Sequence, residues 1–382
     1  MRRILVAVAA AVLVASGCQA QQQRESVQLM LGRHAAAVLA HDEAAFLADV
    51  TPEERPAQRR VFRNLAGVPL ASWSYRLQRR SGGDAEVQLR YRLKGYDTAP
   101  VTSGIAMTLA GNGGRWRIAA VTDSPAQLWD QGPVRVARGA HSLVLGPGGE
   151  ASLKAYAADV DRAVTAVTGV WGEGWARRVV VEVPGSLDDM AALLDASPTA
   201  YEGIAAVTTA ELRGSATAVP ADRVVVNPEA FGELSPLGRR VVLTHETTHV
   251  ATRTATTSRT PLWLSEGLAD WIGYRGTGQT PKEVAPELSR DVAAGRLPDA
   301  LPSDADFGTT AGGLAQSYEG AWLACRLIAD RWGEAKLLAL YRAAGEGATA
   351  DATADAAMRR TLGLGIVEFT ARWRAYVQRE LG

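Results

Sequence analysis

The chain has 382 residues, of which 47% are hydrophobic and 21% are charged, and its formal net charge is zero. This composition is typical of a folded globular protein, and the length allows two domains with separate cores. Acidic and basic residues balance and no basic stripe is present, so the sequence lacks the electrostatic attraction that proteins use to bind nucleic acid. We therefore expect no nucleic-acid partner.

The N-terminal segment has the layout of a bacterial export signal. Two arginines precede an apolar run, residues 4–15, that is too short to span a bilayer as a helix. The small residues Ser16 and Gly17 then stand directly before Cys18. This stretch resembles the bacterial lipobox, in which the cysteine sulfur receives a diacylglycerol and becomes the new N-terminus. Residues 1–18 are predicted to be a lipoprotein signal peptide, and a plain cleaved signal peptide is the alternative.

A lipidated Cys18 would place the protein outside the cytoplasm, anchored to the cell membrane. Cys18 and Cys325 are the only cysteines, so no disulfide is expected if Cys18 carries lipid. Cys325 lies in an apolar helical pattern and is interpreted as a small buried residue rather than as a reactive thiol. Residues 19–25 are polar and are interpreted as a short tether.

Residues 26–130 are predicted to form a small α+β domain. Helical spacing over residues 26–47 gives way to alternation over residues 86–94, where every second residue is apolar and one face of a strand is buried. Further strands are expected at 73–77, 101–109 and 116–121, and a glycine-rich hairpin turn at 111–114.

The order of one or two helices followed by an antiparallel sheet resembles the cone-shaped domains related to nuclear transport factor 2. Such a domain could bind a ligand or a partner, or could space the rest of the chain from the membrane. No cluster of catalytic residue types occurs in residues 26–130, which favours the spacer or partner role.

The segment from 125 to 148 is rich in proline and glycine, which places a domain boundary near 125–140. The second domain, residues 140–382, is expected to be mainly helical, and the fold class of the chain is α+β. Before residue 235 its expected elements are helices at 152–170 and 187–195 and strands at 178–183, 205–212 and 223–227. The Val-rich strands are interpreted as core, although either could present an edge to an extended peptide.

The sequence His245-Glu246-Thr-Thr-His249 carries the chemistry of this domain. Ser235 and Pro236 read as the N-cap and first residue of its helix. Two imidazoles at positions i and i+4 face the same side of a helix and can hold one Zn²⁺ at about 2.0–2.1 Å each. The glutamate between the histidines can act as the general base that takes a proton from the water activated by zinc and passes it to the leaving amine.

A second acidic motif follows in Pro261-Leu-Trp-Leu-Ser-Glu266-Gly-Leu-Ala-Asp270. If the first helix ends near Arg253 and the second begins at Pro261, the short loop favours antiparallel neighbours. At 1.5 Å per residue, His249 lies about 6 Å and Glu266 about 7.5 Å from the turn, so the two side chains reach the same height.

By the same count, His245 and Asp270 lie about 12 Å and 13.5 Å from the turn. Asp270 is therefore placed to accept the free N–H of His245, which would fix the tautomer of a metal ligand.

These two motifs resemble the gluzincin metallopeptidases, which include thermolysin and the MA-like peptidases. The resemblance implies that Glu266 is the third zinc ligand, that Asp270 supports the ligands, and that the chain hydrolyses peptide bonds. Sixteen residues separate His249 from Glu266, fewer than aminopeptidase and thermolysin relatives use. Tyr318, at the start of a later helix, is the candidate for stabilising the oxyanion, and a tyrosine that merely packs there is the alternative.

The sequence thus predicts a lipid-anchored zinc peptidase that acts on a peptide or protein substrate. The alternative is a non-catalytic, zinc-containing envelope lipoprotein that serves as a binding or scaffold module. Retention of Glu246 beside the three predicted ligands favours the enzyme, because a purely structural zinc site is closed by a fourth ligand and needs no base. Hydrolysis of a different amide or an ester stays open, since the motif specifies water activation and not the bond attacked.

Overall fold

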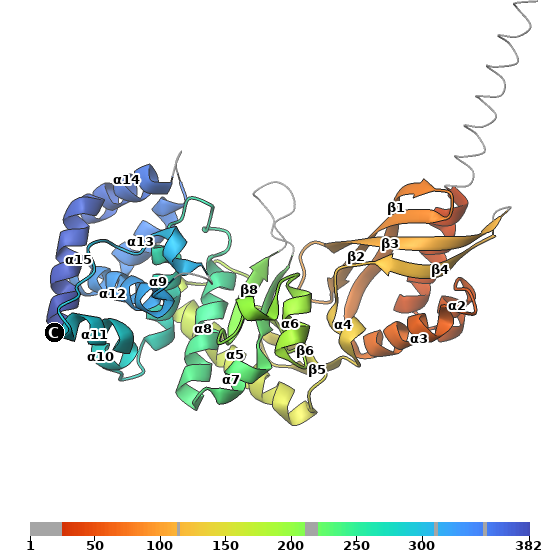
Figure 1. The fold of residues 1–382 in the computed structure, drawn as a ribbon, viewed down its shortest axis with the longest axis horizontal. Coiled ribbons are helices and arrows are strands. Elements are labelled where there is room, and N and C mark those ends of the chain that lie inside the picture. The colour runs from red at the N-terminus through yellow and green to blue at the C-terminus, as the bar shows by residue number, and fades with distance from the viewer. Residues whose placement is uncertain (1–24, 113–114, 211–220, 309–311, 347–349) are drawn as a thin grey trace, which may run out of the picture. The chain divides into compact units, whose positions relative to one another are not determined.

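The structure is a computed structural model that describes residues 25–112, 115–210, 221–308, 312–346 and 350–382 (Figure 1). The predicted signal peptide, Cys18 and all but the last residue of the tether lie outside these ranges. Within them, no helix combines the length and apolar character needed to cross a membrane.

The chain divides into two compact units. Unit 1 comprises Met1–Val136, Leu145–Pro147 and Ala192–Asp195, and unit 2 comprises Ala137–Val144, Gly148–Ala191 and Ala196–Gly382. An antiparallel sheet in unit 1 precedes the mostly helical unit 2, which confirms the predicted α+β class.

The helices of unit 1 begin with residues 25–39, followed by α2 (Glu43–Ala48), α3 (Arg55–Asn64) and α4 (Leu128–Gln131). The helical pattern predicted over 26–47 is interrupted at His41, whose φ of +53° is incompatible with a right-handed helix. Asp42 then accepts a hydrogen bond from the Ala45 amide and starts α2 as its N-cap. Helix α3 and the 3₁₀ turn Leu65–Gly67 lie in a segment for which the sequence predicted no element.

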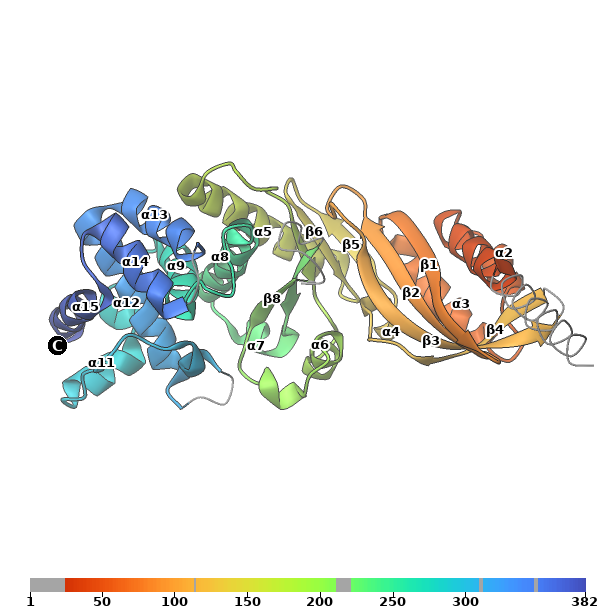
Figure 2. The same ribbon diagram turned by 90° about the horizontal axis from the view of Figure 1, so that it is seen from above.

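The sheet of unit 1 is an antiparallel meander of β1 (Leu70–Ser81), β2 (Asp84–Leu93), β3 (Val101–Asn112) and β4 (Arg115–Asp123) (Figure 2). All four predicted strands are present, each longer than its sequence pattern indicated. In β2 every second residue is buried, from Ala85 to Leu93, as the alternation predicted. Buried residues of helix 25–39, including Met30 and Leu31, pack in one core with residues from all four strands.

A second sheet, most of whose residues belong to unit 2, has five strands in the order β5-β6-β7-β9-β8. Its strands are β5 (Arg135–Arg138), β6 (Ser142–Gly146), β7 (Val179–Glu182), β8 (Ala206–Ala210) and β9 (Asp222–Val226). Strands β7 and β9 run parallel, β8 pairs antiparallel with β9, and β8 is an edge strand among the described residues. The segment that the sequence assigned to an irregular boundary therefore carries α4, β5 and β6. Strand β6 is buried at all five positions and so shows no alternation that sequence reasoning could detect.

The helices of unit 2 pack on this sheet and beyond it. Near the sheet they are α5 (Glu150–Trp171), α6 (Leu187–Leu193), α7 (Pro228–Glu233) and α8 (Pro236–Thr252). The helices that follow are α9 (Leu262–Tyr274), α10 (Pro281–Val284), α11 (Pro286–Ala293), α12 (Leu314–Trp332), α13 (Glu334–Ala344), α14 (Ala350–Leu362) and α15 (Ile366–Leu381). Helices α5 and α8 contribute to the core beneath the sheet, whereas α9 and α12 lie in a separate, helical core. Helices α8 and α9 therefore meet where the two cores of unit 2 adjoin.

Candidate metal centre

Two capping signals set the ends of the helices that carry the candidate site. The Ser235 hydroxyl accepts a hydrogen bond from the Gly238 amide and Pro236 is the first residue of α8, as predicted. Helix α8 ends at Thr252, and Pro261 precedes the first residue of α9. The two helices pack against each other across the short connection that the sequence predicted.

Three side chains from these helices converge on one point. The Nε2 atoms of His245 and His249 lie 3.0 Å apart, and Oε2 of Glu266 lies 3.2 Å from the first and 3.3 Å from the second. Both pairs that the helix rise placed at matching heights are in contact, His249 with Glu266 and His245 with Asp270, and His245 also reaches Glu266.

These distances suit a tetrahedral metal ion. Ligand atoms held at the usual zinc distances stand about 3.3 Å apart on a tetrahedron, close to all three separations seen here. Two imidazole nitrogens and one carboxylate oxygen are also a donor set that zinc favours, and these three side chains are grouped closely enough to hold a metal ion. The residues present therefore fit the metal that the sequence predicted.

Asp270 contacts His245, as the sequence predicted. Its Oδ1 lies 2.7 Å from Nδ1 of His245 and accepts a hydrogen bond from it, an arrangement that in the neutral imidazole leaves the Nε2 lone pair for a ligand. Burial by itself would lower the pKa of His245, but the Asp270 carboxylate outweighs it and the pKa is raised well above its usual value. Burial would likewise raise the pKa of Glu266, yet the two adjoining imidazoles hold it well below its usual value. Glu266 is therefore a carboxylate, the form that ligates metal.

Glu246 is buried beside the triad and has a partner that the sequence did not reveal. The hydroxyl of Thr208 on β8 donates to Oε2 of Glu246 at 2.6 Å and lies 3.2 Å from the main-chain oxygen of the same residue. Because Thr208 holds one carboxylate oxygen, the side chain of Glu246 is fixed relative to the edge strand. The contact joins residues 38 positions apart in sequence, and no local pattern signals it.

Tyr318, near the start of α12, lies beside the same residues. Its ring centroid is 6.3 Å from that of His245 and 5.2 Å from that of Phe307, whose ring is nearly perpendicular to it. Burial raises the pKa of Tyr318, and the carboxylates of Glu266, Asp270 and Glu246 raise it further. The hydroxyl therefore stays protonated and is available as a hydrogen-bond donor.

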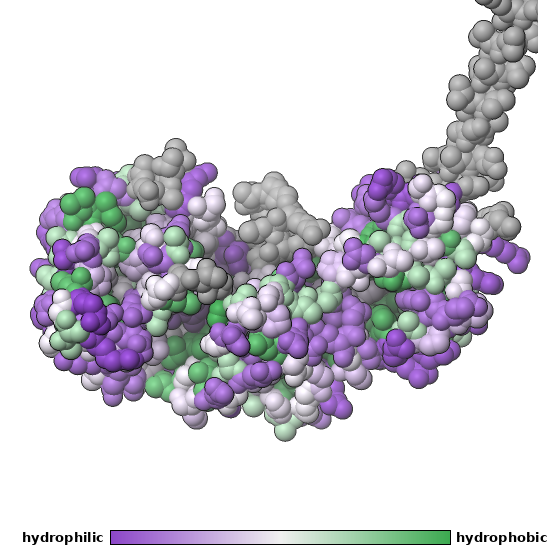
Figure 3. Space-filling model, in the orientation of Figure 1, coloured by the Kyte–Doolittle hydropathy of each residue, from purple (hydrophilic) through white to green (hydrophobic). Residues whose placement is uncertain are grey.

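A cavity of about 630 Å³ opens onto these residues, and Figure 3 shows apolar surface in a hollow of unit 2 near α7 and α8. Its lining includes the two histidines, Glu246 and Tyr318, together with the consecutive residues 203–208. A strand that turned one face to the cavity would present alternate residues only. The consecutive lining indicates that the main chain before and along β8 borders the cavity with its edge.

Gly267 allows this site to form, and the sequence analysis missed it. A Cβ atom at this position would lie 2.7 Å from the carbonyl carbon of Ala321 and 2.9 Å from Sγ of Cys325. The absence of a side chain next to Glu266 lets α9 approach the main chain of α12, the helix that carries Tyr318. Cys325 itself is fully buried, in agreement with its interpretation as a small core residue.

The structure thus brings together all six residues that the sequence proposed for the site in this domain: His245, Glu246, His249, Glu266, Asp270 and Tyr318. The seventh candidate, Cys18, lies outside the described residues. Comparison with protein-family models, with curated proteins and with solved structures finds no match to this chain.

Proposed function

We propose that this protein is a zinc-dependent peptidase, with His245, His249 and Glu266 as the metal ligands and Glu246 as the general base. The observation that supports this most is the placement of three ligand atoms 3.0–3.3 Å apart beside a buried carboxylate, on the wall of a cavity large enough for a peptide segment. Zinc held there would supply a Lewis acid that activates water and polarises the scissile carbonyl.

The contacts of Glu246 support its proposed role as the general base. Thr208 engages Oε2, so the other carboxylate oxygen is the one that accepts a proton from the attacking water. The water oxygen bonds to the carbonyl carbon, the carbon–nitrogen bond breaks, and Glu246 delivers the proton to the departing amine. One peptide bond and one water molecule become a carboxylic acid and an amine, which ionise to a carboxylate and an ammonium group, with no other reactant.

Two further elements serve the substrate. Tyr318 keeps its proton beside three carboxylates and is suited to donate to the oxygen on which negative charge develops. The edge of β8 offers main-chain groups to an extended peptide that adds to the sheet as a strand. This edge directs the proposal to peptide bonds rather than to a small amide or an ester. The absence of a Gly-x-Met-x-Asn stretch, which anchors a free N-terminus in aminopeptidases of the resembled family, favours an endopeptidase.

We further propose, from the predicted lipobox, that the protein acts on the outer face of the cytoplasmic membrane and is held there through lipid on Cys18. Mass spectrometry of the N-terminal peptide from membrane-extracted protein tests this separately from catalysis. A diacylated Cys18 at the new N-terminus supports the anchor, and an N-terminus at a different residue refutes it.

Elemental analysis and peptide cleavage together test the enzymatic proposal. The wild-type protein should contain one zinc per chain and cleave members of a mixed peptide library. His249→Ala should lose both zinc and cleavage, whereas Glu246→Gln should keep zinc and lose cleavage. Wild-type protein that binds zinc without cleaving any peptide would favour the binding or scaffold alternative. A chain that takes up no zinc on reconstitution would refute the metal site.

A further inference from the structure

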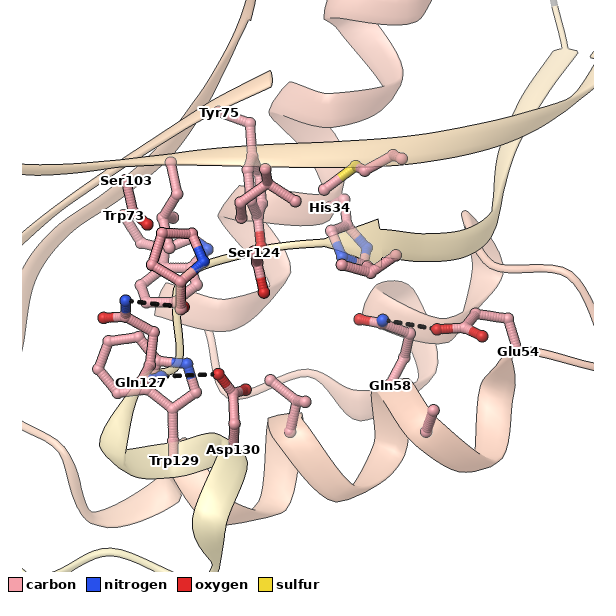
Figure 4. A pocket seen from close by; sticks show the side chains of 17 residues that line it. His34, Glu54, Gln58, Trp73, Tyr75, Ser103, Ser124, Gln127, Trp129 and Asp130 are labelled. Atoms are coloured by element: carbon pink, nitrogen blue, oxygen red, sulfur yellow. Dashed lines mark hydrogen bonds between the residues drawn. The ribbon is translucent and has the colours of Figure 1, made fainter. Parts of the chain in front are cut away.

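A second cavity, of about 220 Å³, lies within unit 1 between the sheet and its helices (Figure 4). Strands β1 to β4, helix 25–39, α3 and α4 all contribute side chains to it. None of these residues lines the cavity at the candidate metal centre. The cavity is therefore a separate candidate site, and its use does not depend on the proposed peptidase activity.

Aromatic side chains form one part of its wall. Trp73 and Tyr75 stand two residues apart on β1 and so point to the same face of the sheet, and Trp129 joins them from α4. The Trp73 ring centroid lies 5.5 Å from that of Trp129 and 6.0 Å from that of Tyr75. Electron-rich rings grouped in this way attract an organic cation that approaches their faces.

The charged groups of the wall have one sign. Glu54 and Asp130 line the cavity, whereas no lysine or arginine does so among the described residues. Glu54 accepts a hydrogen bond from the Gln58 side chain at 2.9 Å, and Asp130 accepts one from the Gln127 amide at 2.9 Å (Figure 4). Both carboxylates are thus held by neutral donors, and their charge is not balanced by a basic side chain of the wall.

His34, the histidine that lines the cavity, adds no positive charge to the wall. His34 is 1% exposed, and its Nδ1 lies 3.0 Å from the main-chain oxygen of Phe46, so Nδ1 carries the proton. Burial lowers the pKa of His34 to about 4, so the ring is neutral at physiological pH. An anion entering the cavity would meet two carboxylates and no cation.

We propose that the unit 1 cavity binds a small organic amine in its cationic form, with the apolar body against Trp73, Tyr75 and Trp129 and the ammonium group near Asp130, the carboxylate that lies beside these rings (Figure 4). Unit 1 would then be a ligand-binding domain rather than a spacer only.

Three small probes of one shape test the class of ligand. Benzylamine is a cation at neutral pH, benzyl alcohol is its neutral counterpart and benzoate is an anion. In calorimetric titrations of the full-length protein, benzylamine should bind saturably, benzyl alcohol about tenfold more weakly, and benzoate not at all. Absence of saturable benzylamine binding, or equal binding of benzyl alcohol or benzoate, would overturn the proposal.

Matched variants then locate the site. Glu54→Gln combined with Asp130→Asn should weaken benzylamine binding about tenfold or more, whereas Glu53→Gln should bind as the wild type does, because Glu53 is an exposed neighbour that does not line the cavity. Asp130→Asn alone should show part of the loss, which keeps the test decisive if the double variant unfolds. His249→Ala should retain binding, which separates this site from the metal centre. Equal binding by Asp130→Asn and by the wild type would contradict the assignment.

Discussion

The close approach of α9 and α12 at Gly267 leads to a quantitative prediction. In Gly267→Ala, the new methyl group would lie 2.7 Å from the carbonyl carbon of Ala321 and 2.9 Å from Sγ of Cys325, both far inside van der Waals contact. The carbonyl belongs to a helical main chain and cannot rotate away, so the two helices must separate. Overpacking of this kind costs about 1–3 kcal/mol, and the better helix propensity of alanine offsets only about 0.5–1 kcal/mol. We expect the free energy of unfolding to fall by about 1–2 kcal/mol.

Gly169→Ala is the matched control for this change. Gly169 also lies within a helix, α5, but a Cβ atom there would meet no atom within 4 Å. This substitution should leave stability unchanged or raise it by up to about 1 kcal/mol. Urea unfolding followed by circular dichroism measures both variants against the wild type. If Gly267→Ala were as stable as Gly169→Ala, the proposed tight contact between α9 and α12 would be wrong.

Three further predictions concern single side chains. Asp270→Asn should weaken zinc binding about 10- to 100-fold in a chelator competition, because the ligand His245 loses an anionic partner; an unchanged affinity would contradict this support. On the proposed function, Thr208→Val should lower kcat about tenfold with little change in KM, and Thr208→Ser should restore it; equal rates for both variants would exclude a role in positioning Glu246. Folding lowers the pKa of His34 from 6.5 to about 4, so between pH 6.5 and pH 4 the unfolded chain binds a proton that the folded chain does not. The free energy of unfolding should therefore decrease by about 3 kcal/mol as the pH is lowered from 6.5 to 4. Urea unfolding should show this loss in the wild type but not in His34→Leu, and parallel losses would refute it.

The helices of the candidate metal centre could be predicted because their signals are local. Ser235 and Pro236 mark the start of α8, Pro261 marks the start of α9, and the ligand spacing follows from the helix period. Once both helices are placed, the rise per residue pairs His249 with Glu266 and His245 with Asp270 without any tertiary information.

Other features of the site depend on tertiary contacts, and no local sequence pattern indicates them. Thr208 reaches Glu246 only because β8 pairs with β9 at the edge of the sheet next to α8. Gly267 is followed by a helical pattern like any other, and its role depends on Ala321, a residue 54 positions away whose carbonyl it faces. Such contacts follow from how elements pack, which periodicity does not report.

The missed elements have a similar cause. Strands β5 and β6 have four and five residues, and β6 is buried on both faces, so neither gives the alternation by which the longer strands of unit 1 were recognised. Helix α3 was missed for the opposite reason: it has few apolar residues and only Gln58 is buried in it, so the sequence shows no apolar helical pattern there. Its strongest signal is Pro56 in the first turn, which sequence reasoning did not use.

The short connection between α8 and α9 is stabilised by its own composition. The Thr260 hydroxyl accepts from the Thr257 amide at 3.1 Å, and the Thr257 hydroxyl donates to the main-chain oxygen of Gly345 at 3.1 Å. Thr256 and the Tyr341 hydroxyl share a further hydrogen bond of 2.7 Å. A threonine-rich loop thus satisfies its own polar groups and is fixed to the helical core, so it can be short without being strained. His249 and Glu266 are therefore close in sequence and still in contact in space. Both residues lie at matching distances from the turn, so the loop has only to reverse the direction of the chain.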